Sequence, residues 1–109
     1  MPRDEVEAAY FTLLRAREEL ADLRRYAEYL ADELRRMRRF TQEGQALDDT
    51  VARRLRRALR HTDGPLREAL DARAAVIADE QARMGDRIAA AERFVEECER
   101  EHAELKHGR

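Results

Sequence analysis

The chain has 109 residues and a net charge of −2 at pH 7, with 42% of its residues charged and 6% aromatic. That length suits one domain, and the near balance of charges excludes a general electrostatic attraction to nucleic acid or to a membrane. Regularly spaced apolar residues and only two prolines argue against disorder, so the composition is typical of long helices. We expect one helical domain over residues 1–109.

The first predicted helix covers about residues 3–42, where apolar residues recur at alternating intervals of three and four. Residues spaced in this way occupy the a and d positions of a heptad and form one seam along the helix. The seam residues are Val6, Ala9, Leu13, Ala16, Leu20, Leu23, Ala27, Leu30, Leu34, Met37 and Thr41. Charged residues frame this seam, as expected beside a helix–helix contact, with Glu5 and Glu19 at g positions and Arg17 and Arg24 at e positions.

A short second helix is predicted over about residues 49–61, after the apolar period lapses around Gly44. Glycine takes the left-handed conformation that ends many helices, and Asp48 or Asp49 offers an N-cap side chain for the next one. One face of this helix carries Val51, Leu55, Ala58 and Leu59.

The third predicted helix covers about residues 65–106, because proline is well tolerated in a first helical turn and Pro65 follows a Gly. Its seam residues are Leu70, Ala74, Ile77, Gln81, Met84, Ile88, Ala91, Val95, Cys98, His102 and Leu105. Gly85 lies inside this helix and is a possible break, but the heptad phase is the same on both sides of it. We therefore expect the helix to continue through Gly85.

The apolar surface of the first helix is wider than its seam. Tyr10 and Leu14 extend it on one side, and Tyr26 and Phe40 extend it on the other. A face this broad meets more than one neighbouring helix. The predicted fold is therefore all-α: an elongated helical bundle or antiparallel coiled coil of two long helices and one short helix, completed by homodimerisation.

The candidate binding residues are two groups of four arginines, which we expect near one end of the molecule. The groups are Arg35, Arg36, Arg38 and Arg39, and Arg53, Arg54, Arg56 and Arg57. Few carboxylates precede them by four residues, so pairing within the helices cannot neutralise them. Guanidinium groups bind phosphates with little sequence discrimination, which makes nucleic acid one candidate ligand. The other interpretations are a solvated face, pairing with the acidic C-terminal end, or an acidic protein or membrane surface.

Metal binding and catalysis have weaker support. Cys98 and His102 share a helical face, and Glu99 and Glu104 each stand three residues before a histidine. Di-iron bundles carry such Glu-x-x-His pairs on two different helices, whereas here both lie at one helix end. No phosphate-binding glycine loop or nucleophile motif occurs. We expect no cofactor and no enzymatic activity.

The expected location is the cytoplasm. Cys98 is the only cysteine, so no internal disulfide forms. The N-terminal residues lead directly into an acidic amphipathic helix, and no apolar stretch is long enough for a membrane span. The expected function is that of a small non-enzymatic interaction or scaffolding protein, with regulation as one option, that acts through coiled-coil surfaces. A nucleic-acid-associated protein is the first alternative and a metal-binding bundle the second.

Overall fold

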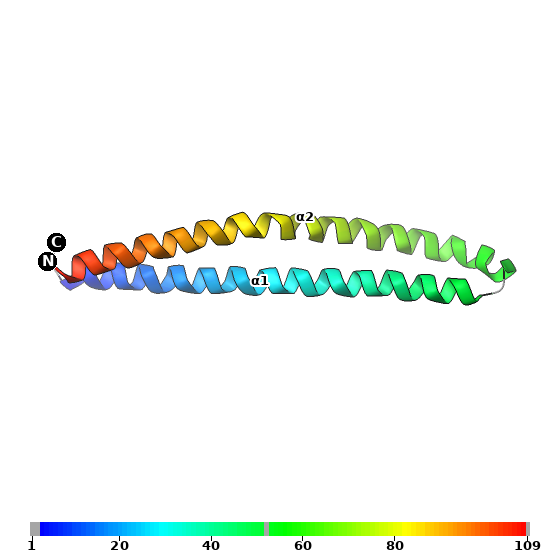
Figure 1. Ribbon diagram of the computed structural model, residues 1–109, viewed down its shortest axis with the longest axis horizontal. Coiled ribbons are helices and arrows are strands. Elements are labelled where there is room, and N and C mark those ends of the chain that lie inside the picture. Colours follow the sequence, from blue (N-terminus) through cyan, green and yellow to red (C-terminus); the bar gives the residue numbers. More distant parts are fainter. Residues whose placement is uncertain (1–2, 52, 109) are drawn as a thin grey trace. The chain divides into compact units, whose positions relative to one another are not determined.

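The computed structural model describes residues 3–51 and 53–108, and all of their side chains except those of Arg3, Asp48 and Arg54. Two long helices account for almost all of this part of the chain (Figure 1). Helix α1 covers Arg3–Thr50 and helix α2 covers Arg53–Lys106. The prediction of an all-α fold built on two long helices is confirmed.

Both predicted seams face inward. Every seam residue of the first and third predicted helices is buried or half-buried, and Leu13, Leu30 and Met84 are among the most buried. The neighbouring b, c and f positions are mostly exposed, which is the burial pattern that a heptad repeat imposes on packed helices.

The predicted break around Gly44 is wrong, because α1 continues through it to Thr50. Gly108 is the residue with a positive φ angle among those that the structure describes, so Gly44 has no left-handed conformation. The chain leaves α1 only at Val51. There the Thr50 hydroxyl donates to the Leu47 carbonyl at 2.8 Å, and Nε of Arg56 donates to the Val51 carbonyl at 2.8 Å. These bonds satisfy carbonyl groups that a helix end leaves free.

The predicted break at residues 61–65 is also wrong, and no separate short helix occurs within 3–51 and 53–108. Helix α2 passes through Pro65, although an interior proline removes one helical hydrogen bond and costs about 3 kcal/mol. Gly64 reduces the local conflict, because the ring of a proline also clashes with the Cβ of the residue before it, which glycine lacks. The prediction that the helix continues through Gly85 is confirmed.

The chain divides into two compact units. Unit 1 consists of Met1–Ala27 and Arg83–Arg109, and unit 2 consists of Glu28–Ala82, so each helix contributes to both. The core of unit 1 contains Leu13, Ala16, Leu20, Val95 and Cys98, with Ile88 and Ala91 packed against it.

The helices of unit 1 are antiparallel. Arg17 lies 3.5 Å from Glu99, and farther along α1 Arg24 lies 3.9 Å from Glu92. All four residues occupy e positions of their heptads. The two helices therefore meet with their e positions on one side of the seam and their g positions on the other.

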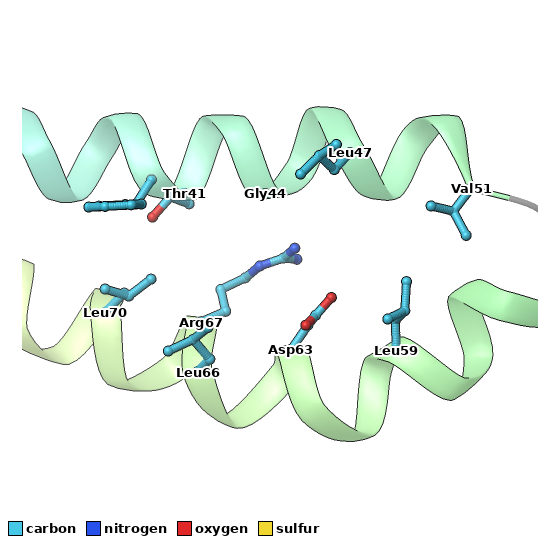
Figure 2. A pocket seen from close by; sticks show the side chains of 10 residues that line it. Thr41, Gly44, Leu47, Val51, Leu59, Asp63, Leu66, Arg67 and Leu70 are labelled. Atoms are coloured by element: carbon cyan, nitrogen blue, oxygen red, sulfur yellow. The ribbon is translucent and has the colours of Figure 1, made fainter.

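Unit 2 is also an antiparallel helix pair, whose turn joins α1 to α2. Thr41 lies across from Leu70 and Val51 from Leu59, so the numbering of the two helices runs in opposite directions (Figure 2). The buried residues of this unit are Leu30, Leu34 and Ile77 among those described. They lie in the part of unit 2 farthest along the sequence from the turn.

Candidate interaction surface

Most of unit 2 lacks a closed core. Among the described side chains of residues 35–76, none is buried. We call this stretch, which includes the turn, the open segment. Several of its leucines are exposed to solvent, in contrast with unit 1, where Leu13 and Leu20 are buried. Two helices with their apolar residues in water gain little from packing, so the open segment lacks the main source of helix stability in a protein.

The cause lies in the sequence of α2. Counting the heptad of α2 back from Leu70 toward the turn gives a and d positions that are all charged. They are Arg53, Arg56, Arg60, Asp63 and Arg67. On α1 the corresponding seam contains the polar Thr41 and the small Gly44. Charged and small side chains cannot fill the space between two helices at core density, so the pair stays open here.

The exposed large apolar residues of unit 2 lie on one side of the seam. Seven large apolar side chains of unit 2 are exposed among those described, and all seven occupy g or c positions. They are Tyr29, Phe40, Leu47, Leu55, Leu59, Leu66 and Val76. In an antiparallel pair the g positions of both helices border the same side, and each c position adjoins a g position of its own helix, so these residues share one side of the pair. We call it the apolar flank.

The middle of the apolar flank is hollowed into a groove of about 280 Å³. Phe40 and Leu47 of α1 and Leu59 and Leu66 of α2, all at g positions, contribute to its lining. Figure 2 shows Val51 directed toward α2 and Leu59 directed toward α1. Arg67 and Asp63 extend into the space between the helices and form the polar part of the groove (Figure 2).

The other side of the open segment is polar. Its e positions include Arg38 and Gln45 on α1 and Asp71 on α2, and Arg38 and Asp71 line a common shallow depression. Unit 2 is therefore amphipathic across its width, with the apolar flank on one side and charged residues on the other. Several large apolar side chains exposed along one side of a helix pair are typical of a site for another protein.

The first arginine group is exposed and partly paired within its own helix. Arg35 forms an ion pair with Asp32, and Arg36 lies 3.6 Å from Glu33. Arg38 and Arg39 are also exposed.

The second arginine group begins α2, where Arg53, Arg56 and Arg57 are exposed. The side chain of Arg54 lies outside the described part of the structure. Arg56 has a local role, since its hydrogen bond to Val51 caps the turn. Arg39 precedes the end of α1 by about 11 residues, which at 1.5 Å per residue is roughly 16 Å of helix between the two groups. The structure does not merge them into one continuous patch.

The residues considered for metal binding belong to unit 1. Cys98 is buried, and its thiol pKa is raised by burial and by the nearby carboxylates of Glu101 and Glu97. The His102 ring contacts the ring of Tyr10, with centroids 5.5 Å apart. Within the described residues, no group of three or more His, Cys, Asp or Glu side chains is arranged to hold a metal ion. No helix in that part of the chain is long and apolar enough to cross a membrane.

Sequence reasoning found Phe40 as an extra apolar residue but missed the surface to which it belongs. The signal was present in α2 as a second heptad series, displaced from the seam. Its members are Leu55, Leu59, Thr62, Leu66, Ala69, Arg73 and Val76. The assumed break at Pro65 divided this series between two helices and concealed it.

Comparisons of the chain with protein-family models, with curated proteins and with solved structures give no match.

Proposed function

We propose that the protein is a small, non-enzymatic interaction or scaffolding protein that self-associates through the apolar flank. The observation that carries this proposal is the confinement of seven exposed large apolar side chains to one side of unit 2. Covering them removes apolar surface from water, at about 25 cal/mol per Å². It also supplies the packing that the polar seam of the open segment does not provide.

The occupant of the flank is a second copy of the chain. A two-fold symmetric contact brings a surface against itself, so it favours a surface that carries both signs of charge. The charged residues at the g and c positions of the flank meet this condition. They are Glu33, Arg36, Glu43, Arg73 and Glu80. Two helix pairs joined along this side form a four-helix arrangement, a common way to close such a core.

Sedimentation equilibrium at micromolar concentrations tests self-association. The expected mass is twice the 12.8 kDa of the chain. Phe40→Ser should weaken the dimer at least tenfold, because it removes an aromatic anchor from the flank. Phe11→Ser is the matched control, since Phe11 and Phe40 are 64% and 61% exposed but Phe11 belongs to unit 1.

A mass of 12.8 kDa at every concentration would overturn self-association. The flank would then be a binding site for a helix of another protein. Equal weakening by Phe11→Ser and Phe40→Ser would show that a surface other than the flank mediates the contact.

Nucleic-acid association remains the alternative proposal. It is supported by the exposure of Arg38, Arg39, Arg53 and Arg57. Nucleic-acid association ranks below self-association because the two arginine groups are separated, and a continuous basic surface would contact more phosphates at once. A metal-binding bundle is the third candidate, and elemental analysis of the purified protein for iron and zinc tests it.

A further inference from the structure

We propose that the second copy docks antiparallel, with the two-fold axis passing beside Leu66. In this arrangement α2 of one copy runs antiparallel to α2 of the other along the apolar flank. This inference rests on the proposed self-association and specifies its orientation. Three features of unit 2 support it: the arrangement of the apolar series on α2, the extent of the open segment, and the distribution of charge near the turn.

The series of g and c residues on α2 carries large apolar residues at its centre and at both ends. Leu66 lies at the centre, since Leu55 and Val76 are 11 and 10 residues away from it. When the series is reversed about Leu66, Leu55 comes opposite the second copy's Val76. This contact, which occurs twice by symmetry, pairs two large apolar side chains that are exposed in the single chain, 52% for Leu55 and 65% for Val76.

The inner positions are compatible with the same alignment. Thr62 comes opposite the second copy's Ala69, and Leu66 meets its own counterpart at the axis. Leu59 comes opposite the second copy's Arg73, whose aliphatic stem can cover a leucine while its guanidinium stays in water. The alignment places no charged group of α2 against a like charge along this series.

The length of this overlap agrees with the extent of the open segment. An antiparallel contact centred on Leu66 covers α2 from about Leu55 to about Val76. Over the same stretch the described side chains of α2 contain no buried residue, and burial resumes at Ile77. The contact therefore covers the region that lacks a core and stops where the chain provides its own.

Charge selects the antiparallel orientation over the parallel one. A parallel dimer would place the arginines that begin α2 beside the same arginines of the second copy. The antiparallel alignment brings the start of α2, which carries Arg53, level with the second copy's Asp79 and Glu80. Opposite charges across an interface fix orientation, and juxtaposed like charges disfavour the competing one.

Cysteine cross-linking distinguishes the two orientations. In a Cys98→Ala background, single cysteines replace Leu66, Leu55 or Val76, and copper-catalysed air oxidation is followed on non-reducing gels. Disulfides form where Cα atoms approach within about 4.4–6.8 Å. Leu66→Cys is expected to form a homodimeric disulfide. Leu55→Cys and Val76→Cys are expected to cross-link when mixed, and each poorly with itself. Ala75→Cys, an exposed b position of α2, is the control for random collision.

The outcomes distinguish failure of the antiparallel orientation from failure of self-association. Efficient self-cross-linking of Leu55→Cys, without a mixed Leu55→Cys and Val76→Cys product, would establish the parallel orientation and overturn the inference while leaving self-association intact. Cross-linking no faster than that of Ala75→Cys at every position, in a protein that sediments as a dimer, would also overturn it. A monomeric mass in sedimentation would remove the proposed self-association itself.

Discussion

Phe40 of α1 and Leu66 of α2 line the same groove, yet they remain 61% and 59% exposed. Both occupy g positions, one residue away from the seam by which the helices of unit 2 face each other. A displacement of one residue turns a helical side chain by about 100°. The large apolar side chains that would close a core between the two helices of unit 2 therefore face sideways, where another protein chain can contact them.

Truncating leucines should separate the closed part of unit 2 from the open segment. Leu34 is buried, so Leu34→Ala should cost about 2–5 kcal/mol of unfolding free energy. Leu47 is exposed, and Leu47→Ala should change stability by no more than about 0.5 kcal/mol while the protein is monomeric. Urea unfolding followed by circular dichroism at low protein concentration measures both. A cost for Leu47→Ala similar to that for Leu34→Ala would mean that the groove is closed in the single chain.

Replacing Gly44 should stabilise the protein. Gly44 lies inside α1, and a Cβ built there has no neighbouring atom within 4 Å. Gly44→Ala should therefore gain about 0.5–1 kcal/mol through helix propensity, a rise of a few degrees in Tm. Gly108→Ala should give no such gain, because its φ of 79° is unfavourable for alanine. A loss of stability in Gly44→Ala would mean that α1 ends at Gly44.

Cys98 should be unreactive in the folded protein and should make stability depend on alkaline pH. Burial and the charges of Glu101 and Glu97 raise the thiol pKa above its ordinary value of 9.0. The unfolded thiol therefore loses its proton first as pH rises, so the stabilising contribution is complete below about pH 9 and declines above it. Alkylation at pH 8 should be slow and should accelerate in urea.

Cys98→Ala supplies the comparison for this pH dependence. The difference in unfolding free energy between the wild type and this variant should shrink as the pH rises above about 9. A difference that is constant across this range, together with rapid alkylation of the folded protein, would show that the thiol is accessible to solvent.

The arginine groups should contribute little to binding if the protein acts through its apolar flank. The wild type is then expected to pass through DNA and RNA columns at about 0.15 M salt without retention. Retention that falls steeply with salt, and that disappears when Arg53, Arg54, Arg56 and Arg57 become Gln, would support the nucleic-acid alternative. Circular dichroism should show unchanged helix content in that variant, even though the cap of Arg56 on Val51 is lost.

The heptad spacing was sufficient to predict both seams and the helical class, because periodic burial leaves a direct trace in the sequence. Helix ends were predicted less well. Gly44 and Pro65 are local signals for a helix end, yet each lies inside a longer helix in this fold. The true turn follows Asp49 and Thr50. Side chains of these types form hydrogen bonds with nearby backbone groups, but their presence alone does not indicate where a helix ends.

The candidate site was harder to predict for a related reason. Arginine groups are conspicuous in a sequence, whereas the apolar flank is distributed over two helices and emerges only when α2 is continuous through Pro65. Charged residues at the seam positions of α2, such as Arg60 and Arg67, were the second clue. They indicate that the inner face of α2 near the turn is not its apolar face.

Hydrogen exchange measured over a range of protein concentrations tests the central claim most directly, because it locates the association surface as well as detecting it. Amides in residues 35–50 and 53–76 are expected to gain protection as the concentration rises, while those in residues 83–106 stay constant. Protection of residues 35–76 that does not change with concentration, or a gain confined to residues 83–106, would contradict self-association through the apolar flank.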